Sequence, residues 1–266
     1  MASDETRAEA DGPAGRLTWR RVGDGPPLVL INGYAGSADD WDPTFLGALG
    51  GPFSVICPNN RGIGGSDLGS EPVSVDAMAD DVLAILDHLE LETAPIAGWS
   101  MGGFIAQELA ALAPERVEAL VLISSRSGGP EAISAPAEVW NRLTDHSGTP
   151  REQATRLIGL LFPPDVAEQI DRDFGEVVAE ARAQLSAESL DQQKRAIEGW
   201  HTSGREPPTV PVLAAAGSLD QVVMPENSIA LAAGEGDWLA RFPGCGHAFM
   251  AQEPVRVAAL IAAFLR

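Results

Sequence analysis

The sequence has 266 residues, of which 45% are hydrophobic and 21% charged, so it can bury a sizeable core, and we expect a folded rather than a largely disordered chain. A formal net charge of −20, from 38 acidic and 18 basic residues, argues against nucleic acid or an anionic membrane as a partner. The acidic N-terminus has no apolar segment and no apolar run is long enough to span a membrane, so we expect a soluble, cytoplasmic protein with a disordered leader over residues 1–15.

Short β-branched or leucine-rich runs alternate with helical patterns along most of the chain. This alternation predicts an α/β fold with a mostly parallel, doubly wound sheet of about eight strands and helices on both faces. The clearest helical periodicity covers residues 74–89, 104–112 and 255–265. The expected strands cover residues 17–21, 27–32, 53–57, 94–98, 117–124, 211–217 and 237–242.

The alternation stops between residues 127 and 208, where only helical patterns occur. We therefore expect a helical cap over 127–208, inserted between two parts of one core, 16–126 and 209–266. Within the cap, helices are expected over residues 137–143, 151–161, 164–170, 173–184 and 190–200.

One serine stands in a G-x-S-x-G motif, in the stretch PIAGWSMGG at residues 95–103. A strand that ends at Gly98 and a helix that begins near Met101 place Ser100 in a sharp turn with its hydroxyl exposed. Glycine suits positions 98 and 102 because a strained serine turn crowds both neighbours. Since about 0.2 chance matches are expected from the glycine content, the motif needs support from its context.

Three further turns supply that context, each after a predicted strand. The strand 27–32 ends in a glycine-rich turn at Asn32-Gly33-Tyr34, whose backbone N–H groups could bind an oxyanion. Asp220 follows the strand 211–217, and His247 follows the last strand. Parallel strands thus carry a serine, an acid and a histidine, in that chain order, to one edge of the sheet.

With these motifs the chain resembles the α/β-hydrolase fold family from about residue 17 to the C-terminus, and the turn at residues 59–66 resembles that family's R-G-x-G-x-S loop. The resemblance implies Ser100 as nucleophile, His247 as general base and then acid, and Asp220 as the group that orients the histidine. The same chemistry follows from the residues, because serine is a poor nucleophile until a base takes its proton. An aspartate in Gly-Ser-Leu-Asp could instead only shape a turn.

The resemblance also implies the backbone N–H groups of Tyr34 and Met101 as oxyanion donors. The family commonly has histidine at the position of Asn32, which leaves the geometry of that turn open. With serine at position 100 the chain resembles the esterases, enol-lactonases and cofactor-free perhydrolases more than the relatives that use aspartate there.

Side chains for the substrate pocket are weaker candidates, because aromatic and leucine residues serve equally well as core. The candidates are Tyr34, Trp41, Trp140, Leu161, Phe162 and His201. Four dispersed histidines and the lack of a dinucleotide motif predict no metal and no cofactor. Cys57 and Cys245 are expected as free thiols, because in this fold their strands lie about five positions, or ~24 Å, apart.

The sequence therefore favours a carboxylesterase-like or lactonase-like serine hydrolase that forms an acyl-enzyme at Ser100 on a small to medium apolar ester or lactone. Two alternatives remain open. The same triad could serve a C–C bond hydrolase, lyase or cyclase of secondary metabolism, or the fold could be a non-enzymatic ligand receptor.

Overall fold

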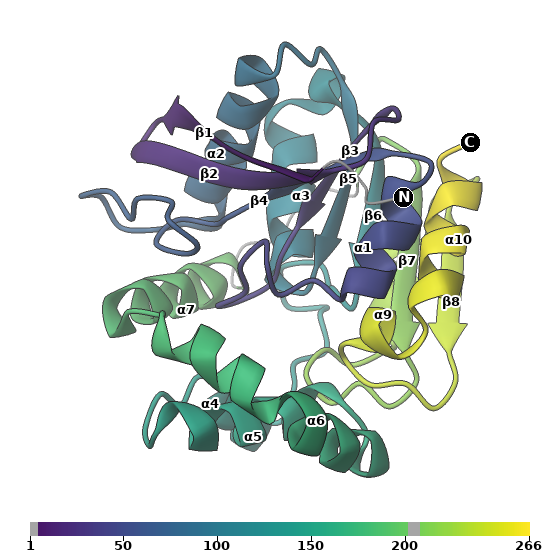
Figure 1. Cartoon of the computed structure of the whole chain (residues 1–266). Helices are drawn as coiled ribbons and strands as arrows, with labels where there is room; N and C mark the ends of the chain where they lie inside the picture. The colour runs from purple at the N-terminus through teal and green to yellow at the C-terminus, as the bar shows by residue number, and fades with distance from the viewer. Residues whose placement is uncertain (1–4, 202–207) are drawn as a thin grey trace.

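The computed structural model describes residues 5–201 and 208–266, apart from the His201 side chain. These residues form an eight-stranded sheet in the order β1-β2-β4-β3-β5-β6-β7-β8 (Figure 1). Pairing is antiparallel from β1 to β2 and from β2 to β4, and parallel from β4 to β8. The strands are β1 (Glu5–Gly12), β2 (Gly15–Val22), β3 (Pro27–Ile31), β4 (Ser54–Pro58), β5 (Ala94–Trp99), β6 (Val117–Ile123), β7 (Val212–Gly217) and β8 (Trp238–Phe242).

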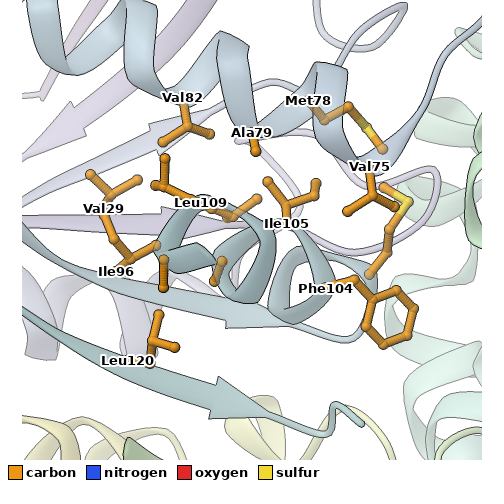
Figure 2. Packing of buried hydrophobic residues seen from close by; sticks show 14 of the residues in the cluster. Val29, Val75, Met78, Ala79, Val82, Ile96, Phe104, Ile105, Leu109 and Leu120 are labelled. Carbon is orange, nitrogen blue, oxygen red and sulfur yellow. The ribbon is translucent and has the colours of Figure 1, made fainter. Parts of the chain in front are cut away.

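Helices cover both faces of this sheet. Successive side chains of a strand point to opposite faces, so the apolar strands present an apolar surface to the helices on each side. On one face Val29, Ile96 and Leu120 pack against α2 (Val75–His88) and α3 (Met101–Leu112), as Figure 2 shows. On the other face Leu30, Ala97 and Val121 join a cluster with α1 (Pro43–Gly50) and α10 (Pro254–Phe264). The predicted doubly wound sheet is confirmed, and burial on both faces explains its continuous apolar strands.

The cap region contains four helices among the described residues and no strand between 127 and 201. They are α4 (Ala137–Leu143), α5 (Pro150–Leu161), α6 (Pro164–Ala183) and α7 (Ala187–His201). In Figure 1 they lie together beyond one end of the sheet. The two helices expected over 164–170 and 173–184 are a single helix, α6. The charged pair Asp171-Arg172 interrupts the apolar pattern but not the backbone, and Asp171 instead binds Arg151 of α5 at 2.7 Å.

The N-terminal segment differs from expectation. Residues 5–12, expected within a disordered leader, form the edge strand β1, which pairs with β2 in register over its whole length. Most of its side chains are exposed, so its sequence lacks the apolar pattern that predicts a strand. The backbone ladder to β2 and the two-pronged ion pair of Arg7 with Asp39, both bonds 2.8 Å long, hold it in place.

Cys57 in β4 and Cys245 after β8 are free thiols, as the sequence predicts, and both are buried. Their strands are separated by β3, β5, β6 and β7. Over the residues that the structure describes, no helix is both long and apolar enough to cross a membrane.

Besides α1, three short helices lie outside the helical ranges expected from the sequence. The 3-10 turn η1 (Pro114–Arg116) leads into β6, α8 (Asn227–Leu231) follows β7, and α9 (Phe249–Gln252) precedes α10. The last of these places a helical turn directly after the histidine loop that follows β8.

Candidate active site

Ser100 occupies the turn between β5 and α3 in a strained backbone conformation, with φ 55° and ψ −117°. A non-glycine residue is uncommon at positive φ and costs energy there. The flanking glycines make the turn possible: a Cβ at Gly98 would clash with the backbone of Gly102, and a Cβ at Gly102 would clash with the backbone of Ile31 in β3. The turn predicted from G-x-S-x-G is therefore present, and close packing against β3 explains the second glycine.

Asp220 and His247 lie in the loops after β7 and β8 and meet across them. The Nδ1 atom of His247 lies 2.8 Å from Oδ2 of Asp220, and the two side chains are 2% and 0% exposed. The other carboxylate oxygen, Oδ1, accepts hydrogen bonds from the backbone N–H groups of Val222 at 2.8 Å and Val223 at 2.9 Å. Asp220 thus shapes its own turn and also fixes the histidine ring.

Trp99, the residue before the serine, joins the histidine loop to the serine turn. Its indole Nε1–H donates to the carbonyl oxygen of His247 at 3.1 Å, and the two rings lie 5.2 Å apart between centroids. Within the described chain the Ser100 hydroxyl makes no hydrogen bond. Catalytic hydrogen bonds in enzymes without substrate are often long and tighten only in the complex.

The turn after β3 presents backbone N–H groups beside Ser100. Gly33 packs so closely on Ser100 that a Cβ would lie 3.2 Å from the serine Cβ. The Asn32 side chain holds both ends of this turn, accepting from the N–H of Gly33 at 2.7 Å and donating to the carbonyl of Ser37 at 2.6 Å. Asparagine at this position therefore stabilises the turn rather than disturbing it.

The two backbone N–H groups proposed from the sequence are available. The N–H of Met101 is the first of α3 and has no helical acceptor. The N–H of Tyr34 has no acceptor among the described residues. Both Tyr34 and Met101 line the same cavity as Ser100.

This cavity has a volume of about 240 Å³ and lies between the sheet edge and the cap. Two of the six pocket candidates, Tyr34 and Trp140, line it. Three others do not: Trp41 and Phe162 belong to the hydrophobic cluster that includes α1 and α10, and Leu161 packs against it. The side chain of the sixth candidate, His201, lies outside the described residues. The ring of Trp41 is tilted against those of Phe45 and Trp99, with centroids 5.9 and 6.1 Å away.

Sequence reasoning missed most of the lining. Besides Tyr34, Ser100, Met101 and Trp140, the cavity is lined by Phe104, Arg126, Ser134, Ala135, Ala137, Leu143, Ile197, Glu198, Val222 and Val223. Arg126 could have been predicted as a lining residue, because it follows β6 at the same sheet edge as the three proposed catalytic side chains. Leu143 and Ile197 carried none, because cap helices expose several similar apolar faces.

The Tyr34 hydroxyl reaches the cap, lying 3.1 Å from Nε2 of His146. Burial raises the pKa of Tyr34 far above its ordinary value, so the phenol stays protonated. Burial also lowers the pKa of His146, and nearby Arg182 lowers it further. A neutral imidazole can accept the phenol hydrogen bond. Among the described residues no group of three or more potential ligands could hold a metal ion.

A serine on a strained strand-to-helix turn, with a buried Asp–His pair from later loops at the same edge of a parallel sheet, is the arrangement of an α/β hydrolase. The chain belongs to this family: the family profile described as the alpha/beta hydrolase fold matches residues 26–196.

Similar proteins agree with this assignment. The chain is 33% identical to a putative carbamate hydrolase, RutD, of Azorhizobium caulinodans over 92% of its own length and 93% of the relative's. It is 29% identical to 3-oxoadipate enol-lactonase 2 of Acinetobacter baylyi, over 75% and 73% of the two chains. The crystal structure of a hydrolase from Pseudomonas aeruginosa PA01 superposes with a TM-score of 0.82, at 26% identity and 98% coverage of each chain. These relatives indicate hydrolase activity.

Proposed function

We propose that the protein is a serine hydrolase that cleaves a small to medium, largely apolar ester or lactone through an acyl-enzyme at Ser100. One observation carries the proposal: the cavity under the cap contains the strained serine, and the buried Asp220–His247 pair lies at the same sheet edge. Strained backbone of this kind persists where surrounding structure enforces it, and it concentrates at functional sites.

In the proposed mechanism, Oγ of Ser100 attacks the substrate carbonyl carbon while Nε2 of His247 takes the hydroxyl proton. The carbonyl electron pair moves to oxygen, and the N–H groups of Tyr34 and Met101 stabilise that oxyanion. Collapse of the tetrahedral intermediate breaks the ester C–O bond, and His247 returns the proton to the leaving oxygen. A water molecule then attacks the acyl carbon while His247 takes its proton. Collapse of the second tetrahedral intermediate breaks the bond to Oγ of Ser100, which regains a proton from His247, and releases the acid.

The lining of the cavity supports an ester or lactone of modest size. Phe104, Leu143, Ile197 and Val222 offer apolar contact, and a pocket of about 240 Å³ holds a small molecule rather than a long lipid chain. The enol-lactonase among the relatives supports the lactone half of the proposal.

Treatment with a fluorophosphonate followed by intact-mass analysis tests the nucleophile. Wild type should gain the mass of one phosphonyl group, whereas Ser100→Ala should gain none and lose ester turnover by a factor of at least 10³, because no other hydroxyl is activated. The matched control is Ser70→Ala, an exposed serine that does not line the cavity, which should label like wild type. Equal labelling of Ser100→Ala and wild type would contradict the proposal.

A further inference from the structure

Arg126 is a buried arginine in the same cavity as the proposed nucleophile. It lies three residues beyond the end of β6, its side chain lines the cavity with Ser100, and the residue is only 6% exposed. Neighbouring contacts fix its backbone: the Gln107 side chain donates to the Arg126 carbonyl at 3.0 Å, and Ser125 donates to the Ser100 carbonyl at 3.1 Å.

The guanidinium of Arg126 lacks a carboxylate partner across residues 5–201 and 208–266. Its one side-chain hydrogen bond is from Nη1 to Oγ of Ser134, at the long distance of 3.4 Å. None of its nitrogens is fully buried without a hydrogen-bond partner, and the residue lines the cavity. The lack of a carboxylate partner among the described residues is unexpected, because the chain has 20 more acidic than basic residues.

The carboxylate that also lines the cavity is already engaged. Glu198 binds Nζ of Lys194 at 2.8 Å and accepts from the indole N–H of Trp140 at 3.2 Å. It makes no ion pair with Arg126. Burial lowers the pKa of Arg126, but a guanidinium remains charged at neutral pH, so the cavity holds a positive charge that pairs with no carboxylate of the described residues.

An unpaired buried charge is costly to a folded protein unless something compensates it. We propose that Arg126 binds a carboxylate of the substrate, so that the ester or lactone cleaved at Ser100 carries a second, free carboxylate group. The guanidinium fork matches a carboxylate with two parallel hydrogen bonds. Arg126 is the only cationic side chain among the described residues that line this cavity, which suits a monoanion better than a phosphate dianion. The inference rests on the proposed hydrolase function and narrows its substrate class.

Matched pairs of esters test this inference. The monoethyl esters of succinate, glutarate and adipate are compared with ethyl esters in which a neutral isopropyl group replaces the carboxylate. Wild type should show a kcat/KM about 10- to 100-fold higher for the best acid ester than for its neutral partner, the factor expected of a charge-assisted hydrogen bond. In Arg126→Met, which keeps an unbranched apolar stem and loses the charged guanidinium, this ratio should fall to about 1.

The matched control is Arg142→Met, an exposed arginine of α4 that does not line the cavity, and it should keep the wild-type ratio. A wild-type ratio of 1 or less, or a ratio unchanged in Arg126→Met, would overturn the inference while leaving the hydrolase proposal intact.

A binding measurement separates the two proposals if no ester is hydrolysed. Ser100→Ala should bind monoethyl glutarate in calorimetry, and the double variant Ser100→Ala/Arg126→Met should bind it at least ~10-fold more weakly. Arg126-dependent binding without turnover in wild type would support the carboxylate site and reject the hydrolase. Equal binding by both variants would reject the carboxylate site whatever the turnover.

Discussion

At the scale of single residues, Asp220 does two jobs with one carboxylate. Oδ1 accepts hydrogen bonds from the N–H groups of Val222 and Val223, and Oδ2 accepts one from the Nδ1–H group of His247. Because both oxygens are committed, the histidine is held in the tautomer whose Nε2 can accept a proton.

Asp220→Asn should therefore lower kcat by about 10²- to 10⁴-fold while the fold survives. The new amide oxygen must stay with Val222 and Val223, so its NH₂ group faces Nδ1 of His247 and forces the ring proton onto Nε2. Steady-state kinetics on an ester that wild type cleaves checks this. Asp237→Asn serves as control, since that aspartate caps the N–H groups of Val212 and Gly234 away from the cavity. An unchanged kcat in Asp220→Asn would move the acid elsewhere.

At the scale of elements, helix α7 of the cap supports the proposed oxyanion turn. Gln193 is fully buried; its oxygen accepts from the N–H of Ala35 at 3.0 Å and its nitrogen donates to the carbonyl of Arg61 at 3.2 Å. Ala35 has φ of 61°, a conformation that an alanine adopts only when neighbours enforce it. One cap side chain therefore helps to position the N–H of the preceding residue, Tyr34.

Gln193→Leu should lower the free energy of unfolding by about 2–4 kcal/mol, because two buried backbone groups lose their partners. It should also lower kcat more than it raises KM, since the turn that holds the Tyr34 N–H relaxes. Denaturant unfolding and ester kinetics measure the two effects.

The neighbouring Gln192→Leu is the control for this experiment. Gln192 accepts one hydrogen bond, from the N–H of Val73 at 3.2 Å, and does not touch the oxyanion turn. It should cost less stability and leave kcat near wild type. If both variants lose kcat equally, α7 acts only as a general support for the fold.

At the scale of the whole molecule, the cap and the core meet through titratable groups. The imidazole of His146 faces Tyr34 of the core, with Arg182, Arg156, Asp145 and Asp191 around it. Burial and the two arginines lower the pKa of His146 and outweigh the two aspartates, which raise it. The folded protein therefore prefers the neutral ring, and Nδ1 of that ring is buried without a partner.

A lowered histidine pKa makes stability depend on pH in a defined direction. Above the unfolded-state pKa of about 6.5 both states carry a neutral His146, and the full stability is present. Below it the unfolded chain binds a proton that the folded protein resists, so stability is lost as the pH falls toward the folded-state pKa. Denaturant unfolding at pH 7.5 and 5.5 should show a larger loss for wild type than for His146→Gln.

His88→Gln is the control for this pH experiment, because His88 is exposed at the end of α2. It should lose as much stability between the two pH values as wild type does. An equal loss in wild type and His146→Gln would show that the cap histidine does not couple to folding.

Much of the fold and the proposed triad could be predicted because their signals are local. The glycines at 98 and 102, the strand before them and the helix after them lie within one short stretch, and each restricts its neighbours directly. Asp220 and His247 each follow a recognisable strand. Parallel strands bring their carboxyl ends to one edge, so chain order alone predicted the meeting that the 2.8 Å contact shows.

The edge strand, the cavity and the surroundings of Arg126 were decided only by the tertiary structure. Strand β1 exists because β2 offers it a backbone ladder, and that partner leaves no trace in an acidic, alanine-containing segment. Gln193 reaches Ala35 across 158 positions of sequence. Whether Arg126 has a partner depends on every chain segment that surrounds it. The sequence by itself determined which groups come to the sheet edge, because local backbone geometry places them. Only the tertiary structure decided what surrounds those groups, because packing joins residues whose separation along the chain carries no information about contact.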